Sequence, residues 1–383
     1  VDAFADDLLL LVQGNRRNEL EQSASEALSV VYRYGTNIGV EVSDSKTVCM
    51  MLKGSLNMLN RVVHVSTNGM DDKRIRCVDR VRYLGVNVGI GMDFSVHIDG
   101  MKRRLTTAIM RLRGVLRKSW GLKRGVVSMV VKGLFLPAVM YGASVWYEQL
   151  HKRKLRGSRR LSEELVSCQR VVLYACTRVC RTVSTEAMQI LFGSLPWDIE
   201  CFRRANCTKS KGPAMNESDL VTDEDLYELS LHECRELVDQ RALAAWQDRW
   251  EATSNGRVTY EWIRDVGFSG RSMKYFGAEP EGLLRLTGHG SMNSFLFSRN
   301  LSNSPACACG TEREDWIHVL CECDMYAAFR DLDSIGVRRT EVGWDVSGVL
   351  LDRASMSVCV PLSSCAFRMR ELIVQRMREN EES

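Results

Sequence analysis

The sequence contains no long hydrophobic run, although 45% of its 383 residues are hydrophobic. No uninterrupted apolar stretch approaches the length of about 18 residues that a transmembrane helix needs, so no membrane-spanning segment is expected. No secretory signal, internal repeat or low-complexity tract is visible either. What remains is a composition ordinary for a globular protein, with 26% charged residues. The length allows about two or three domains.

The 14 cysteines are not arranged as a disulfide framework. They are scattered along the chain, and several lie inside apolar helical patterns, as Cys168 and Cys176 do. Buried thiols in a chain without a secretory signal are typical of a reducing compartment. We therefore expect an intracellular protein whose thiols are free.

Positive charge is concentrated in one segment of the chain. Residues 102–181 contain 19 Lys and Arg against 3 acidic residues, a net charge of +16, and the remainder carries −12 within the total of +4. A solvated helix face explains many charge runs, but so many uncompensated charges repel one another unless a polyanion binds them. The segment therefore predicts nucleic acid as a partner and counts against a purely helical scaffold protein.

Residues 95–118 open this basic segment with an amphipathic helix. Its apolar stripe recurs at helical spacing and consists of Ile98, Met101, Leu105, Ile109, Leu112 and Leu116. Further helices are expected over 126–139, 141–150 and 161–180, and Pro137 should kink or break the first of these three.

The part before residue 93 is expected to be rich in β-structure. One helix over 18–38, with Gly35 as its stop, should pack on short strands. These strands are expected within 40–52 and at 62–65, 75–78 and 83–88.

The first twelve residues hold two adjacent carboxylates between two apolar runs. Leu8 to Val12 is short and uninterrupted, which predicts a strand buried on both faces. Asp6 and Asp7 would then lie at the tip of a β-hairpin, because Asp tolerates turn geometry. Two such carboxylates repel each other unless one is protonated or a cation binds them, and Mg²⁺ prefers carboxylate and phosphate oxygens. The alternative is a pair of solvated turn residues.

Phe4-Ala5-Asp6-Asp7 and the leucines after it resemble the F/Y-x-D-D catalytic hairpin of reverse transcriptases. Alanine at the second position is typical of the enzymes of non-LTR, type I retrotransposons. The resemblance implies that Asp6 and Asp7 bind the catalytic Mg²⁺ ions, which clamp the reacting oxygens of phosphoryl transfer. The family's third catalytic Asp and its fingers lie before this hairpin, so the chain is expected to be a C-terminal fragment that cannot polymerise alone.

Two later stretches follow in the order of the same family. Residues 39–47 end in Lys46-Thr47, and Tyr83-Leu84-Gly85-Val86 is similar to the primer-grip hairpin that ends the palm. The resemblance implies that Lys46 acts near the incoming triphosphate as a charge stabiliser or acid. It also implies that Tyr83, Leu84 and Gly85 position the primer end.

The resemblance implies an α+β fold with four parts. Residues 1–92 would be the C-terminal part of a reverse-transcriptase palm, 93–208 a helical thumb or connection and 209–225 a linker, followed at 226–383 by a helical nucleic-acid-binding region with a zinc knuckle at 307–323. The thumb would lie along the template–primer duplex and contact its phosphates. The residues expected to do so are Lys102, Arg103, Arg104, Arg111, Lys123 and Arg124.

The knuckle is a second constellation with the spacing C-x-C-x8-H-x4-C. Cys307 and Cys309 lie on an expected turn, and His318 and Cys323 follow on an expected helix. Three thiolates and one imidazole make a closed tetrahedral Zn²⁺ site of the structural type. Cys321 competes with Cys323 for the last position, since it lies three residues from His318 on the same helix face. Unrelated cysteines of a cysteine-rich chain are the remaining alternative.

Thr287-Gly288-His289-Gly290, Phe295-Leu296 and this Cys/His pattern together resemble the C-terminal zinc-knuckle region of arthropod non-LTR Pol proteins, including those that insert into ribosomal RNA genes. The resemblance implies an RNA-directed DNA polymerase that copies element RNA into DNA at a nicked target in the nucleus. Its partners would be the element RNA template, the DNA primer or target DNA, and dNTPs. Endonuclease activity is implied for the parent polyprotein only. The alternative is a non-enzymatic nucleic-acid-binding protein built from the basic helices and the knuckle.

Overall fold

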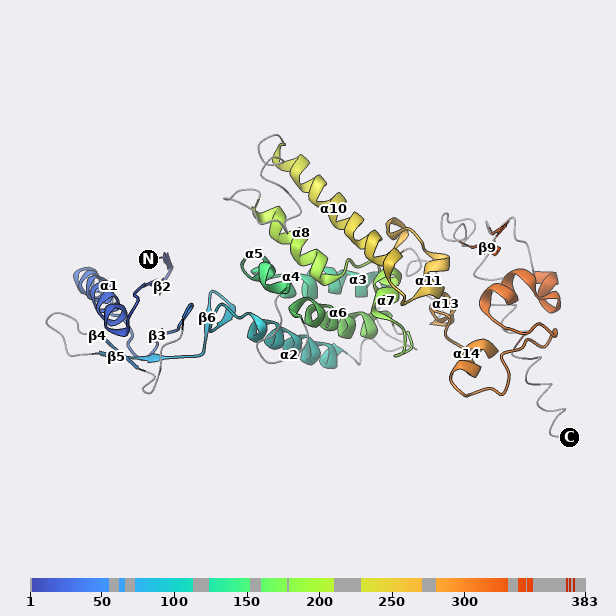
Figure 1. Cartoon of the computed structure of the whole chain (residues 1–383), viewed down its shortest axis with the longest axis horizontal. Helices are drawn as coiled ribbons and strands as arrows, with labels where there is room; N and C mark the ends of the chain where they lie inside the picture. The colour runs from blue at the N-terminus through green and yellow to red at the C-terminus, as the bar shows by residue number, and fades with distance from the viewer. Residues whose placement is uncertain are drawn as a thin grey trace. The chain divides into compact units, whose positions relative to one another are not determined.

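The computed structural model describes most of the chain in separate stretches: residues 2–54, 62–65, 73–112, 124–151, 160–177, 179–209, 229–270, 280–329, 337–341, 343–346, 370, 372 and 375. Helices dominate and small sheets accompany them, so the fold class is α+β (Figure 1). The described residues divide into two compact units between Gly100 and Met101. The assignment of these units to a palm and a thumb stays a prediction.

The chain begins with the predicted hairpin. Strand β1 (Asp2–Phe4) pairs antiparallel with β2 (Asp7–Leu9), and Phe4 stands opposite Asp7. The two-residue turn is therefore Ala5-Asp6, with Ala5 at a φ of 52°, and Asp7 begins the second strand. The predicted burial of Leu8 to Val12 is wrong, since Leu8 is 49% exposed. Among the described residues this sheet has two strands only, and within the run it is Leu10 that packs on the core.

Helix α1 (Arg17–Ile38) matches the predicted helix over 18–38. Gly35 does not end it. This residue is buried inside the last turns, where an added Cβ would lie 2.7 Å from the carbonyl oxygen of Val40 as the chain folds back. The helix instead ends at Gly39, whose φ of 72° is left-handed. The buried side chains Leu28 and Tyr32 form a small core with Ile75.

Three short strands make the sheet beneath α1. They are β3 (Val48–Cys49), β4 (Val62–Val65) and β5 (Lys73–Cys77), in the order β3-β5-β4, with β3 parallel and β4 antiparallel to β5. Strands β6 (Arg80–Tyr83) and β7 (Val86–Gly89) form a separate hairpin. The single strand expected over 83–88 is therefore wrong. Leu84 and Gly85 both have positive φ, 44° and 85°, and this turn reverses the chain between β6 and β7.

Helix α2 (Ser95–Leu112) carries the predicted apolar stripe. Its buried side chains are Ile98, Met101, Leu105 and Ile109. The expected continuation to residue 118 lies outside the described residues. Next come α3 (Arg124–Val130), η1 (Val131–Phe135) and α4 (Leu136–Val139). Here Pro137 does not break the helix. A wide π turn comes directly before Pro137, and in it the N–H of Leu136 donates to the carbonyl of Val131. Such a turn changes the local hydrogen-bond pattern, so the helix can continue through the proline.

The large core of the second unit lies among the helices that follow. They are α5 (Ala143–Trp146), η2 (Tyr147–His151), α6 (Leu161–Thr177), α7 (Thr185–Phe192), α8 (Trp197–Lys209) and α10 (Leu231–Ala252). Helix α8 packs against both α5 and α10, and α6 packs against α7 (Figure 1). Trp146, Leu165 and Trp197 are almost fully buried there. The side chain of Gln169 joins three helices, because it donates to the carbonyl of Leu195 and accepts from the side chain of Gln189 and the backbone of Trp197.

Smaller elements complete the described chain. They are α11 (Arg257–Trp262), η3 (Val266–Phe268), α13 (Pro280–Leu286), α14 (Asn293–Ser298), η5 (His318–Glu322), η6 (Asp324–Phe329), β8 (Arg338–Thr340) and β9 (Gly343–Asp345). Within the described residues, no single helix is both long and apolar enough to cross a membrane. One bent pair, 126–139 with 143–150 at 47°, passes that test by length and composition together. Its large apolar side chains Phe135 and Trp146 are buried.

Candidate functional site

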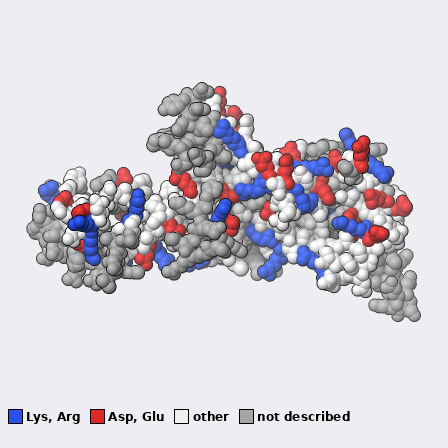
Figure 2. All heavy atoms as spheres, in the orientation of Figure 1, with Lys and Arg blue, Asp and Glu red and all other residues white. Residues whose placement is uncertain are grey.

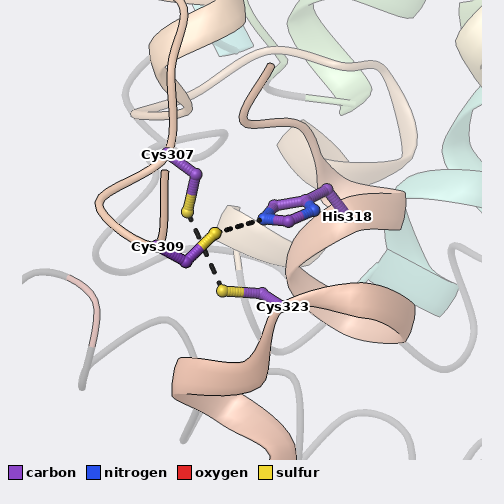
Figure 3. Close-up of side chains that lie close together, drawn as sticks. All are labelled: Cys307, Cys309, His318 and Cys323. Atoms are coloured by element: carbon purple, nitrogen blue, oxygen red, sulfur yellow. Dashed lines mark hydrogen bonds between the residues drawn. The ribbon is translucent and has the colours of Figure 1, made fainter. Parts of the chain in front are cut away.

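Four side chains of the second unit converge on one point (Figure 3). The sulfur atoms of Cys307, Cys309 and Cys323 and a ring nitrogen of His318 all lie within 4.8 Å of one another. The Sγ atoms of Cys307 and Cys323 are 3.8 Å apart, and Cys309 Sγ lies 3.3 Å from His318 Nε2. A tetrahedral zinc ion with Zn–S bonds of about 2.3 Å sets its sulfurs roughly 3.8 Å apart. The donor set and its spacing therefore fit a structural zinc ion.

Local backbone geometry brings these four residues together. Cys307 donates its N–H to the carbonyl of Thr311 at 2.9 Å, which closes a tight loop around Cys309. On the other side, η5 is a π turn, so the N–H of Cys323 reaches back five residues to the carbonyl of His318 at 2.8 Å. The wide turn sets Cys323, rather than Cys321, beside His318. Cys321 is buried but does not belong to the group.

The thiols of the group differ in acidity. Burial raises the pKa of Cys307 to about 12, and burial also raises the pKa of Cys323. For Cys309, burial alone would raise the pKa, but hydrogen bonds with Thr311, Cys307 and His318 together outweigh it and lower the pKa to about 6. Metal ions bind cysteine as thiolate, so metal binding at this group releases protons and weakens as the pH falls.

Two carboxylates stand just outside the four side chains. Glu322 Oε2 lies 3.3 Å from His318 Nδ1, and Glu322 Oε1 accepts a hydrogen bond from Trp344 Nε1 at 3.0 Å. A carboxylate on Nδ1 fixes the ring so that Nε2 points to the metal position. Glu314 lies behind Cys307, with Oε1 3.9 Å from its sulfur. Sequence reasoning missed both. Glu322 had a signal, its spacing of four from His318, whereas no local pattern singles out Glu314.

The predicted catalytic residues are arranged differently. Asp6 and Asp7 are neighbours at the hairpin tip and are both exposed. Among the described residues, neither belongs to a group of three or more possible metal ligands. Lys46 is exposed on the turn before β3, and within the described chain it forms no ion pair with either carboxylate. The described residues therefore do not complete a two-metal site around this hairpin.

Only some of the residues predicted to contact nucleic acid are exposed in the structure. Leu84 is exposed at the turn of β6 and β7, while Tyr83 and Gly85 are half-buried. Along α2, Arg103, Arg104 and Arg111 are exposed. Lys102 instead pairs with Glu164 at 3.2 Å. Lys123 and the side chain of Arg124 lie outside the described residues.

The described charges on the drawn face of the molecule are mixed. Figure 2 shows Lys and Arg atoms interspersed with Asp and Glu atoms rather than gathered in one field.

The chain has relatives over almost its whole length. It is 45% identical over 381 residues to the Retrovirus-related Pol polyprotein from type-1 retrotransposable element R1 2 of Nasonia vitripennis. The matched region covers 98% of this chain and 91% of that protein. The chain belongs to the Pol polyproteins of type-1 R1 retrotransposable elements. The family predicted from the first dozen residues and the knuckle is thus confirmed.

Other R1 Pol polyproteins give the same answer. A second Pol polyprotein of Nasonia vitripennis, from element R1, is 43% identical over 313 residues, 82% of this chain and 90% of that protein. The R1 Pol polyprotein of Bradysia coprophila is 39% identical over 380 residues, 99% of this chain but only 37% of that longer protein. No family model matches the chain, and no solved structure matches it significantly.

Proposed function

We propose that the chain is part of an RNA-directed DNA polymerase that copies element RNA into DNA at a nicked target. Its relatives are named as retrotransposon Pol polyproteins, and the observation that carries the proposal is the hairpin that exposes Asp6 and Asp7 at its tip. Residues 1–92 act as the C-terminal part of the palm and residues 93–208 as the thumb. In this proposal the two carboxylates are two of the Mg²⁺ ligands of a polymerase site, and Lys46 acts close to the incoming dNTP.

The Cys/His group serves as a structural zinc centre within the same protein. Cys307, Cys309, His318 and Cys323 hold the ion, which cross-links the loop 307–311 to the turn η5. The knuckle so formed helps to hold template RNA or target DNA. We place this activity in the nucleus, where target DNA lies, and assign the nick itself to an endonuclease of the parent polyprotein.

The exposed arginines of α2 contact the phosphates of the template–primer duplex. Arg103, Arg104 and Arg111 are exposed on one helix, and Leu84 with its hairpin lies against the primer end. Phosphate contacts of this kind are nearly independent of sequence and weaken as salt rises. Binding of an RNA–DNA duplex by the chain should therefore fall steeply with ionic strength.

The decisive experiment uses a chimera. The chain replaces the corresponding part of the Bradysia coprophila Pol polyprotein, and RNA-templated dNTP incorporation is measured with Asp6 and Asp7 intact or both changed to Asn. We expect incorporation with the intact pair, none with the double variant, and none with the chain alone. Duplex binding serves as the control for folding. A double variant that incorporates dNTPs as well as the intact chimera would refute the catalytic role.

A second candidate is a non-enzymatic nucleic-acid-binding protein. One observation favours it, namely that within the described chain the Cys/His group is complete whereas the Asp pair has no third metal ligand. It predicts that the chimera binds the duplex but that Asp6→Asn with Asp7→Asn changes nothing in any synthesis measured.

A further inference from the structure

A buried ion pair lies directly behind Cys307. Glu314 is 1% exposed and Arg370 is 3% exposed. The pair is bidentate, because Arg370 Nε donates to Glu314 Oε1 at 2.9 Å and Nη2 donates to Oε2 at 2.6 Å. Two charges are rarely buried unless their geometry satisfies both. The partners are 56 residues apart in sequence, so this contact joins the knuckle to Arg370, a residue well beyond it.

Glu314 also holds the chain that leads into Cys307. Its N–H donates to the carbonyl of Pro305 at 2.8 Å, and its Oε2 accepts from the N–H of Asn293 at 2.8 Å. The side chain of Asn293 in turn donates to the carbonyl of Ala306 at 2.7 Å. The two residues before Cys307 are therefore fixed by a network that includes the carboxylate of Glu314, and Arg370 closes that network with a further contact to Asn293 Oδ1 at 3.3 Å.

The charge on Glu314 has a consequence for a bound metal. In a zinc centre Cys307 is a thiolate, and its negative sulfur would face a carboxylate oxygen at 3.9 Å. Like charges at this distance in a buried site disfavour each other. The guanidinium of Arg370, bound to both oxygens of Glu314, offsets the negative charge of that carboxylate.

We propose that Arg370 is a positioning residue of the metal centre, which acts through Glu314 to fix the loop of Cys307 and to offset the charge behind it. Arg370 is then a structural part of the centre, although it is not itself a metal ligand. The inference rests on the proposed zinc site and adds to it a residue that the Cys/His pattern does not contain.

The test compares Arg370→Met with Arg249→Met in the whole chain. Arg249 forms an ion pair with Asp198 at 2.9 Å, with its own side chain more exposed, and takes no part in the knuckle, so it controls for the loss of an ion pair elsewhere in the chain. Zinc affinity is measured by competition with a chelator, and the absorption spectrum of the Co²⁺-loaded chain reports the ligand geometry. We expect Arg370→Met to bind zinc about 10- to 100-fold more weakly, the usual effect of losing an outer partner, and to change the Co²⁺ spectrum. Arg249→Met should do neither.

Two further variants separate positioning from folding. Arg370→Lys keeps the charge but loses the two-pronged contact, so its zinc affinity should be intermediate. Arg370→Met combined with Glu314→Gln removes the uncompensated carboxylate and should recover part of the loss. Wild-type affinity in Arg370→Met would overturn the proposal, as would an equal loss in Arg249→Met. If the unchanged chain takes up no zinc, the proposed zinc site is refuted. If the chain binds zinc but Arg370→Met does not weaken the binding, only the role of Arg370 is refuted.

Discussion

The two candidate metal sites of this chain differ in how much of each site the local backbone builds. At the Cys/His group, one loop and one π turn bring four ligands within 4.8 Å, and two carboxylates stand behind them. At the hairpin, the turn presents Asp6 and Asp7 to solvent with no third ligand among the described residues. A site whose ligands come from one short stretch is organised by that stretch, whereas a site that draws on distant strands needs the rest of its sheet.

The largest expected effect on the difference between the two sites comes from removing one zinc ligand. Cys323→Ser should lower zinc affinity by more than the roughly 100-fold that loss of an outer partner costs, because zinc loses one of its four ligands. Zinc content and chelator competition measure the effect. Cys321→Ser is the matched control, since Cys321 is buried two residues away but lies outside the group. Asp7→Asn should leave zinc content unchanged, and a shared loss would contradict the separation of the two sites.

The second prediction compares a core residue of the helical unit with an exposed residue of the first hairpin. Leu165 is fully buried among the helices, whereas Leu8 is half-exposed on β2. Leu165→Ala leaves a cavity and should lower the free energy of unfolding of the helical unit by about 2–5 kcal/mol. Leu8→Ala should change stability by no more than about 0.5 kcal/mol, as surface substitutions usually do. Denaturant unfolding followed by circular dichroism measures both. Equal losses would mean that the first hairpin has a core partner after all.

The sequence predicts well those elements of this molecule that interactions between neighbouring residues determine. The helix over 18–38, the buried stripe on α2 and the hairpin at Asp6 follow from spacing that neighbouring side chains enforce. Gly35 was misread because its role depends on Val40, which packs against it only after the chain turns back. The strand expected over 83–88 failed because turn conformation at Leu84 outweighs its apolar side chain.

The candidate site shows the same limit. The spacing of the Cys/His pattern predicted which residues come together, and a helix of ordinary pitch left Cys321 and Cys323 as alternatives. The π turn that favours Cys323 has no signature in the sequence. Arg370 could not be found at all, because a partner 56 residues away is chosen by tertiary packing and not by spacing.

The third prediction sharpens the metal comparison with a residue outside the ligands. Glu322→Gln keeps the size of the side chain but removes the charge that faces His318 Nδ1. Zinc affinity should fall by about 10-fold, because the imidazole becomes a poorer ligand when its outer carboxylate is lost. Glu312→Gln, at an exposed position of the loop between Cys309 and Glu314, is the control and should have no effect. If both variants bind zinc equally well, Glu322 does not orient His318.

The smallest expected effects compare the starts of two helices of 22 residues, one in each unit. Helix α10 begins with a capping box, in which Ser230 and Glu233 exchange hydrogen bonds, whereas Arg16 at the start of α1 gives no side-chain cap. Ser230→Ala should lower the free energy of unfolding by about 1 kcal/mol. Arg16→Ser places a serine three residues before Glu19 and should raise it by up to about 1 kcal/mol, because it creates the same box. Thermal unfolding of both variants gives the two values.

The capping box also gives this prediction a pH signature. Hydrogen bonds from the Ser230 hydroxyl and backbone hold the pKa of Glu233 below its ordinary value of 4.5. A lowered carboxyl pKa stabilises the folded state above the ordinary value, and this contribution is lost as the pH falls through the lowered pKa. In Ser230→Ala the pKa of Glu233 should move back toward 4.5, which NMR titration measures. An unchanged titration would show that the backbone N–H of Ser230 alone lowers this pKa, and the hydroxyl would then act only as the acceptor for the N–H of Glu233.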